Sequence, residues 1–208
     1  MKIAVIGAGN VGGALGKAWA GRGHEVTFGD RGSGRAQKTA EASGGNARAA
    51  SVRDAAAAAE VVVLAVPFSG AQDAVRSAGD LSGKVLIDCT NPLTPDYSAL
   101  VVGHTSSAAE QVASWARGAR VVKCFNSLGA QNLANPRFGD QAASMFLCGD
   151  DKAAKQTVID LGRQLGLDMV DAGGLTRARL IEPLALLWIT LAYAEGNGPG
   201  IAFRLLRR

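Results

Sequence analysis

The chain opens with an apolar run followed by closely spaced glycines, in the segment MKIAVIGAGNVGGAL. Lys2 to Ile6 is short, apolar and β-branched, which predicts a buried strand that ends at glycine. Gly7, Gly9 and Gly12 then form the pattern G-x-G-x-x-G, and the apolar residues after it recur at helical spacing. A glycine turn between a strand and a helix presents bare N–H groups and the positive end of the helix dipole, which together stabilise an anion.

Each glycine of this pattern meets a different geometric need. Gly7 permits the tight turn, Gly9 lets a diphosphate approach the main chain, and Gly12 lets the helix pack closely on the strand. Asp30 follows at about twenty residues, the spacing at which dinucleotide-binding units carry an acidic residue. We therefore expect this loop to bind the diphosphate of a dinucleotide. The residues expected to contact it are Gly7, Ala8, Gly9, Asn10, Val11 and Gly12.

The segment after the second predicted strand carries both kinds of group that distinguish NAD from NADP. Asp30 is placed like the carboxylate that accepts hydrogen bonds from the adenosine ribose in NAD-binding proteins. Arg31, Ser33 and Arg35 are donors of the kind that a 2′-phosphate requires, and they are close enough in sequence to surround one. The residues alone leave the choice between the two cofactors open. A solvated polar turn is the alternative interpretation of the arginines.

Two further strand ends carry residues suited to the nicotinamide half of such a cofactor. Open α/β sheets bind their ligands at the carboxyl ends of the strands, where a rigid proline, an aromatic ring and an asparagine would border the nicotinamide or its ribose. Proline before a first helical turn and asparagine in a turn are the simpler interpretations, and these remain open. The residues concerned are Val66, Pro67, Phe68, Asn91 and Pro92.

The stretch VVKCFN places Lys123 and Asn126 around the end of another apolar run. In a catalytic interpretation Lys123 donates a proton to a carbonyl group and Asn126 orients the substrate. In a structural interpretation Lys123 covers the sheet edge and Asn126 begins a turn. We favour ligand positioning over acid–base catalysis. Cys124 is expected in the core, because neither histidine is paired with it as a nucleophile would require.

Alternating strand and helix patterns predict an α/β protein with a Rossmann-type, doubly wound parallel sheet. Residues 1–149 are expected to form the dinucleotide-binding domain and residues 150–208 a small, mainly helical lobe packed on the sheet. Pro183 is expected to kink or split the last helix. The predicted strands are 2–6, 25–30, 61–67, 83–92, 119–126, 143–151 and 167–174, and the predicted helices begin near 11, 33, 106, 151 and 175.

Composition excludes several other classes of protein. The 208 residues carry a net charge of +4, but the basic residues are dispersed and aromatic residues make up 5%, so nucleic acid is not expected as a partner. Three separated cysteines and two histidines give no metal-binding motif, and no metal is expected. The apolar run Leu184 to Ala194 is too short to span a membrane, and no secretory signal is visible, so a cytoplasmic protein is expected.

Taken together, these blocks resemble the coenzyme F420-dependent NADP oxidoreductase family over nearly the whole chain. Related bacterial dinucleotide-binding enzymes and the reductase domain of the STEAP metalloreductases are also similar, the latter at the KCFN strand end. The glycine motif is generic, whereas the DAGG strand followed by a long apolar helix is more specific. The blocks that carry the resemblance are MKIAVIGAGNVGGAL, HEVTFGDR, VVVLAVPFS, GKVLIDCTNPL, ARVVKCFNSLGAQNLANP, CGDD and DAGGLTRARLIEPLALLWITLAYAEGNGPGIAFRLL.

The resemblance implies a crevice that accepts NADP(H), a small C-terminal lobe and a homodimer. Arg31 matches the polar turn that holds the 2′-phosphate in this family, whereas Asp30 stands where a neutral residue is common. The resemblance also implies that a deazaflavin lies over the nicotinamide near Pro67, Phe68, Asn91 and residues 123–127.

The expected activity is therefore hydride transfer between NADP(H) and coenzyme F420 or a similar planar small-molecule partner. Such a reaction depends mainly on holding two flat rings at reacting distance, so a missing acid–base pair is not a difficulty. Three alternatives remain open from the sequence. They are an NADPH-dependent flavin or ferric reductase, a reductase of small carbonyl or imine compounds, and a non-catalytic NADP(H)-binding redox sensor.

Overall fold

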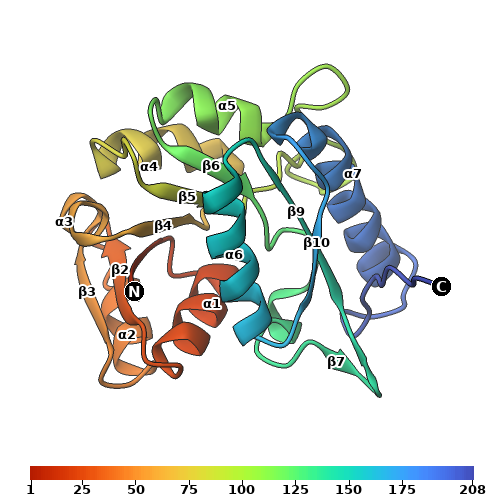
Figure 1. Ribbon diagram of the computed structural model, residues 1–208, viewed down its shortest axis with the longest axis horizontal. Helices are drawn as coiled ribbons and strands as arrows, with labels where there is room; N and C mark the ends of the chain where they lie inside the picture. Colours follow the sequence, from red (N-terminus) through yellow and green to blue (C-terminus); the bar gives the residue numbers. More distant parts are fainter.

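The computed structural model describes all residues, 1–208, and is built on one eight-stranded sheet (Figure 1). The strand order is β10-β9-β6-β5-β4-β1-β2-β3. A separate two-stranded hairpin, β7 with β8, lies outside it. The strands are β1 (Lys2–Ile6), β2 (Glu25–Asp30), β3 (Ala47–Ser51), β4 (Val61–Leu64), β5 (Val85–Asp88), β6 (Arg120–Lys123), β7 (Arg137–Phe138), β8 (Gln141–Ala142), β9 (Ser144–Gly149) and β10 (Asp168–Asp171).

The strands β1 to β6 are all parallel to one another. Their order across the sheet is β3-β2-β1-β4-β5-β6, which is the order of a Rossmann fold. The chain moves outward from β1 through β2 to β3, and then returns to β4 on the other side of β1. This reversal leaves a crevice at the carboxyl ends of β1 and β4, because the connections on its two sides run in opposite directions. The α/β class predicted from the sequence is confirmed.

Helices cover both faces of the sheet and bury a separate apolar cluster on each. The cluster on one face joins the sheet to α1, α2 and α6, and includes Leu15 and Trp19 of α1. The cluster on the other face joins it to α3, α4, α5 and the start of α7. The helices are α1 (Asn10–Ala20), α2 (Arg35–Glu41), α3 (Val52–Ala58), α4 (Ala71–Ala78), α5 (Ala108–Trp115), α6 (Lys152–Gln164) and α7 (Ala178–Ile189).

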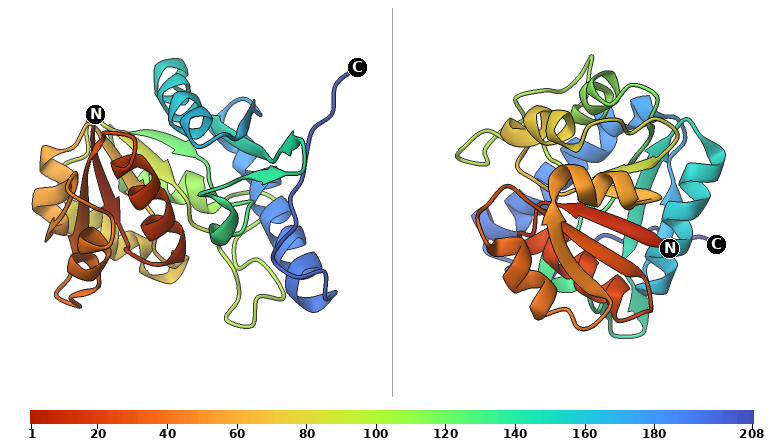
Figure 2. Two further views of the ribbon diagram at one scale, coloured as in Figure 1. Left: turned by 90° about the horizontal axis from the view of Figure 1, so that it is seen from below. Right: turned by 90° about the vertical axis from the view of Figure 1, so that its left-hand side faces the viewer.

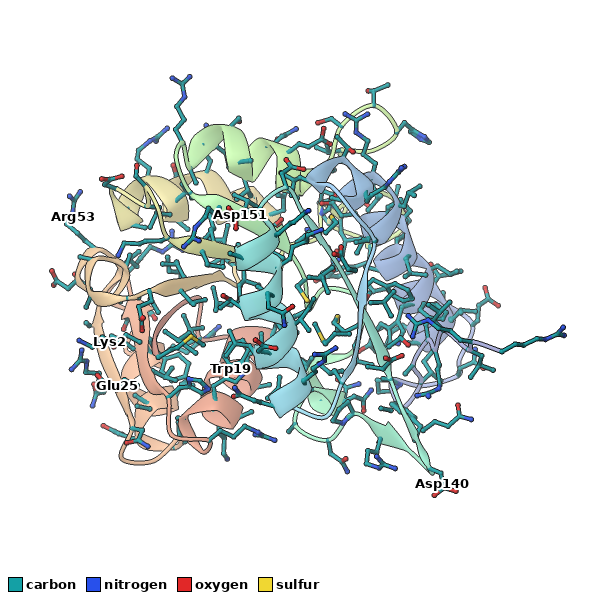
Figure 3. The ribbon with its side chains drawn as sticks, in the orientation of Figure 1. Lys2, Trp19, Glu25, Arg53, Asp140 and Asp151 are labelled. Atoms are coloured by element: carbon teal, nitrogen blue, oxygen red, sulfur yellow. The ribbon has the colours of Figure 1, made fainter.

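The contact between α1 and α6 ties the first and last thirds of the chain together. Figure 3 labels Trp19, whose ring is fully buried there and whose Nε1 donates a hydrogen bond of 3.2 Å to the Leu161 carbonyl oxygen. His24 and Arg22, just after α1, contact Gln164 at the end of α6. Asp151, also labelled, caps the first turn of α6 by accepting a 2.7 Å hydrogen bond from the Ala154 N–H.

Two features of the sheet were not indicated by the sequence. β9 runs antiparallel to β6, so β9 and β10 form a reversed parallel pair at one edge of an otherwise parallel sheet. β3 forms the opposite edge, and its sequence ARAAS has none of the β-branched residues that mark a strand. It is held by parallel pairing with β2, and its alanines add small apolar contacts to the two clusters.

The C-terminal part lies beyond β10 and contains three kinds of helix in succession. A 3₁₀ turn, Leu175–Arg177, leads into α7, and a π turn, Thr190–Ala194, follows it. Pro183 lies within one continuous helix, so the expected split does not occur. The last residues run beside the start of β9, where Ser144 N–H donates to Phe203, and then extend away from the body (Figure 2). The boundary at residue 149 stays a prediction, and the sheet is continuous across it.

None of the helices combines the length and hydropathy that crossing a bilayer demands. The apolar side chains exposed on the last helix and the turn after it are Leu180, Leu187 and Tyr193. Trp188 of the same helix is buried within the chain, and its Nε1 donates to the Ile201 carbonyl oxygen. The homodimer stays a prediction.

Candidate functional site

The turn between β1 and α1 has the geometry that its glycines predict. Gly7 adopts a φ of +102°, which side chains other than hydrogen rarely tolerate. A Cβ on Gly12 would overlap the Gly7 carbonyl oxygen and lie 3.0 Å from a Val5 methyl group, so only glycine lets α1 approach the strand this closely. A Cβ on Gly9 would meet nothing within 4 Å, because Gly9 faces open space.

Gly9 is also the N-cap of α1, and no side chain caps that helix end. The N–H groups of the first helical turn therefore have no side-chain acceptor, and no acidic residue lies among them. An anion placed beside Gly9 would meet these donors and the positive end of the helix dipole.

A cavity of about 760 Å³ opens at this point, in the crevice between β1 and β4. It extends from the glycine turn across the end of β2 to the start of α2, and on its other side to the end of β4. The lining residues are Ile6, Gly7, Ala8, Gly9, Gly29, Asp30, Arg31, Gly32, Ser33, Arg35, Ala36, Val52, Ala65, Val66, Pro67 and Ala74. Nine of the residues expected from the sequence to bind a dinucleotide are among them: Gly7, Ala8, Gly9, Asp30, Arg31, Ser33, Arg35, Val66 and Pro67.

Asp30 uses its carboxylate to fold the loop that follows it. Oδ1 accepts hydrogen bonds from the N–H of Gly32 at 3.2 Å, and from the N–H and the hydroxyl of Ser33 at 3.0 and 2.9 Å. Oδ2 accepts from the N–H of Gly34 at 2.9 Å. These donors, first of all the Ser33 hydroxyl, lower the pKa of Asp30 below its ordinary value. The carboxylate is therefore already supplied with four partners from its own loop.

Two arginines of this loop give the cavity wall a positive charge. Arg31 and Arg35 both line it, and neither guanidinium forms an ion pair with an acidic side chain. Gly32 and Gly34 adopt φ angles of +95° and +69°, which let the loop curve back so that its N–H groups reach the Asp30 carboxylate. The sequence predicted the arginines and the serine, but not that Asp30 would be the residue that organises them.

The nicotinamide-side residues lie at successive strand ends but differ in their surroundings. Pro67 lines the cavity, whereas Phe68 begins a 3₁₀ turn and stacks on Trp115, with ring centroids 5.9 Å apart. Asn91 and Pro92 follow β5 and lie outside the cavity. Of the residues predicted to contact the diphosphate, Asn10, Val11 and Gly12 belong to α1 and do not line the cavity either. The cofactor roles of these residues stay predictions.

Asn91 and Asn126 form a reciprocal amide pair across the ends of β5 and β6. Asn91 Nδ2 donates to the Asn126 backbone carbonyl at 3.0 Å, and Asn126 Nδ2 donates to Asn91 Oδ1 at 2.9 Å. Because a backbone carbonyl only accepts, it fixes the orientation of both amide groups. The Asn126 side-chain oxygen is left buried without a partner. Phe125, just before it, holds a φ of +60°, which is rare for a residue with a bulky side chain.

Lys123 does not face the cavity. Its side chain is 0% exposed, and its ammonium lies 2.9 Å from Asp88 Oδ2 and 3.0 Å from Glu182 Oε1. Burial alone would lower the pKa of Lys123, but the two carboxylates more than offset it, so that pKa is raised and the cation is retained. The proton-donor role stays a prediction, and Lys123 does not belong to the lining of the crevice.

Glu182 is the residue that sequence reasoning missed. It is 1% exposed in the middle of α7, where its neighbours in sequence are apolar. A single acid in an otherwise apolar helix is costly unless it is paired, so this pattern could have indicated a buried partner. Gly29, Ala36 and Val52 also line the cavity without having been predicted, because small and apolar residues carry no chemical signal.

The three cysteines are buried, as expected for Cys124. Burial raises the pKa of each thiol, that of Cys148 to about 12, so none is a thiolate at neutral pH. No group of three or more His, Cys, Asp or Glu side chains is close enough to hold a metal ion.

A six-stranded Rossmann order, an uncapped helix behind a glycine turn, and a cavity at the strand reversal together define a dinucleotide-binding protein. Comparison with known proteins narrows this class. Residues 2–92 match the family described as NADP oxidoreductase, coenzyme F420-dependent. The F420-dependent NADP reductase of Methanothermobacter thermautotrophicus is 34% identical over 207 residues, which cover 92% of this chain and 89% of that protein.

Two further proteins are similar to most or all of this chain. A crystal structure of a candidate F420-dependent NADP reductase from Arthrobacter sp. FB24 has a TM-score of 0.91 and 34% identity, with all of both chains covered. The metalloreductase STEAP3 of Rattus norvegicus is 33% identical over 189 residues, but the match spans 37% of its length. The chain belongs to the F420-dependent NADP reductase family and is an NADP-dependent oxidoreductase.

The two central glycines are expected to fail in different ways when replaced by valine. In Gly9→Val the new side chain projects into open space, so the free energy of unfolding is expected to change little, while dinucleotide affinity falls at least about tenfold because the diphosphate loses its approach. In Gly12→Val the side chain meets the Gly7 carbonyl, and stability is expected to fall by about 1–3 kcal/mol.

Urea unfolding and calorimetric titration with a reduced nicotinamide dinucleotide measure the two effects separately. Gly23→Val serves as the control for a glycine outside the turn, because a Cβ there also meets open space, although its φ of +86° costs some stability. Parent-level dinucleotide affinity in Gly9→Val would contradict the placement of the diphosphate.

Proposed function

We propose that this protein transfers hydride between NADP(H) and a deazaflavin, coenzyme F420, in the crevice at the carboxyl ends of β1 and β4. Family membership and the names of the relatives support the pair of reactants. The observation that carries the nucleotide half is the loop after β2. Its two arginines line the cavity, while the carboxylate of Asp30 is occupied by its own loop.

The dinucleotide is proposed to lie across the crevice. The diphosphate sits at Gly9 and the first turn of α1, where donors without side-chain caps are available. The adenosine end extends over Gly29 toward the loop 30–35. The nicotinamide end extends past Pro67 toward the amide pair Asn91–Asn126, which stands at the ends of the next two strands.

The charge pattern of the loop 30–35 favours a nucleotide with a 2′-phosphate. A free carboxylate at Asp30 would repel that phosphate and accept hydrogen bonds from an unmodified ribose instead. Here both carboxylate oxygens already accept hydrogen bonds from Gly32, Ser33 and Gly34, which reduces their capacity to bind ribose hydroxyls. Two arginines outweigh one carboxylate, and guanidinium groups match the geometry of phosphate oxygens.

The chemistry proposed here asks little of the side chains. Nicotinamide and deazaflavin, when bound, supply the hydride donor and acceptor atoms themselves. The protein's part is to hold the two rings in register and keep water out, with reacting atoms about 3–3.5 Å apart. Lys123, the one basic side chain suggested as an acid, is locked in an ion cluster away from the cavity. Asn126 is then a positioning group beside the nicotinamide rather than an acid or a base.

The choice of acceptor is tested by following oxidation of NADPH with four acceptors in separate assays. These are coenzyme F420, a free flavin, a ferric chelate and a cyclic imine. Turnover with F420 at a kcat/KM at least about tenfold above the other three is expected, because the matching family model and relatives are F420-dependent. A preference for the flavin, the imine or the ferric chelate would contradict the proposal. Tight NADPH binding without turnover of any acceptor would favour a redox sensor.

The 2′-phosphate assignment predicts opposite consequences for two nucleotides. Arg31→Ala and Arg35→Ala are each expected to weaken NADPH binding by about 1.5–3 kcal/mol, the loss of a charge-assisted hydrogen bond, and to leave NADH binding unchanged. Arg163→Ala, on the exposed face of α6, is the matched control.

Asp30→Ala separates the two roles open to that carboxylate, and it is measured by the same pair of titrations. If Asp30 organises the loop 30–35, the variant is expected to bind NADPH more weakly than the parent, because Ser33 and the arginines lose their fixed positions. If Asp30→Ala instead weakens NADH and strengthens NADPH, the carboxylate is a ribose ligand and the assignment is wrong.

A further inference from the structure

We infer that Lys123 is a positioning residue that acts through a buried ion triad, Lys123 with Asp88 and Glu182, to align the Asn91–Asn126 amide pair at the nicotinamide end of the crevice. The inference rests on the proposed function for the site that this pair borders. It gives Lys123 a role that is neither proton donation nor cover for the sheet edge.

The ammonium of Lys123 has no proton left for a substrate. It donates to Asp88 Oδ2 and to the Thr90 carbonyl oxygen and forms an ion pair with Glu182 Oε1 at 3.0 Å, so its three N–H bonds are matched by three acceptors. With a side chain that is 0% exposed, it is out of reach of any molecule in the crevice. A general acid must stand within hydrogen-bonding distance of the group it protonates, and Lys123 does not.

The two carboxylates are satisfied as completely as the cation. Asp88 Oδ1 accepts from the Thr90 N–H at 2.9 Å. Glu182 accepts from the first two N–H groups of α5, at 2.9 Å from Ala108 and 3.1 Å from Ala109. One cation and two anions give the triad a net charge of about −1. The positive end of the α5 dipole lies against Glu182 and stabilises this charge. Every charged atom of the triad therefore has a partner, as the cost of burial demands.

The triad joins four elements at one point. Asp88 ends β5, Lys123 ends β6, Glu182 lies in α7, and its acceptor oxygens cap α5. The two loops that follow these strand ends, residues 89–92 and 124–128, thus start from anchored positions. Figure 1 shows α7 on the far side of β9 and β10 from the nucleotide-binding strands, so Glu182 connects the C-terminal part to the site.

The amide pair lies a few residues downstream of both anchors. Asn91 follows Asp88 by three residues, and Asn126 follows Lys123 by three residues. The route to Asn126 passes through Phe125 at φ +60°, a conformation that persists only where the surroundings impose it. The Phe125 ring is buried against Trp19, with centroids 5.7 Å apart. Asn126 is 8% exposed, and its side-chain oxygen lacks a partner. That oxygen is an acceptor held in a fixed direction.

The test uses variants that remove the triad without leaving a buried charge unpaired. Lys123→Met alone would leave two carboxylates facing each other and is expected to unfold. The triple variant Asp88→Asn, Lys123→Met, Glu182→Gln removes all three charges and retains the shape of the side chains. Glu182→Gln alone keeps a neutral Lys123–Asp88 pair, and only one α5 N–H loses its acceptor oxygen, so it provides a second variant. Lys152→Met, an exposed lysine on α6, is the matched control.

Positioning predicts a defined pattern in these variants. With NADPH and the acceptor that the parent uses, kcat is expected to fall about tenfold to a hundredfold, because small misplacement of reacting groups is costly. NADPH affinity is expected to stay within about twofold of the parent, since the diphosphate and 2′-phosphate contacts lie elsewhere. The loss should not add to that of Asn126→Ala, because both changes act through one loop pair. The shape of the pH profile of kcat should not change.

Hydrogen exchange gives a second measurement that does not depend on turnover. In the triple variant, amides of residues 89–92 and 124–128 are expected to exchange faster, while those of α1 exchange at the parent rate. Parent-level kcat with parent-level exchange would show a triad with no positioning role and overturn the inference. Loss of one limb of the pH profile would make Lys123 a proton donor and overturn it too. If the parent turns over no acceptor, the proposed function fails, and the exchange rates alone decide the inference.

Discussion

The structure depends on the close approach of main chain to main chain at the turn between β1 and α1. Gly12 packs against the Gly7 carbonyl, and this contact brings the N-terminus of α1 to the point where the sheet reverses its direction of winding. Everything in the crevice follows from that placement. The uncapped N–H groups, the open space at Gly9 and the cavity between the ends of β1 and β4 would all be displaced by a single additional carbon at Gly12.

Charge is distributed in the molecule in two contrasting ways. In the loop after β2 the Asp30 carboxylate accepts hydrogen bonds from its own loop, and the arginines next to it remain free to face a ligand. At the ends of β5 and β6 the Lys123 ammonium pairs with the carboxylates of Asp88 and Glu182. None of the three charges is available to a ligand, and the pairing holds the strand ends in place. The first arrangement suits recognition of an anion, and the second suits the alignment of neutral amide groups beside a ring.

Much of the fold could be predicted because its signals are local. Apolar runs indicate β1 and β2, and helical periodicity indicates α6. The glycine turn has a residue pattern whose geometry only glycine satisfies. The edge strand β3 and the reversal at β9 could not be predicted, because ARAAS carries no strand signal and strand direction is set by tertiary pairing.

The candidate site divides in the same way. Residues that line the cavity in the glycine turn and the loop 30–35 were predictable from their spacing. The partners of Asp30 and Lys123 were not, because a sequence shows which groups carry charge but not which charges meet. Glu182 lies 59 positions from Lys123 in the chain, and only the packing of α7 brings the two together.

The central claim is that the loop 30–35 binds a 2′-phosphate beside a diphosphate-binding glycine turn. Calorimetric titration of the parent protein with 2′,5′-ADP and with 5′-AMP tests it most directly, because the two ligands differ only in that phosphate. The account predicts that 2′,5′-ADP binds at least about tenfold more tightly, and that added salt narrows the difference. Equal affinities, or tighter binding of 5′-AMP, would contradict it.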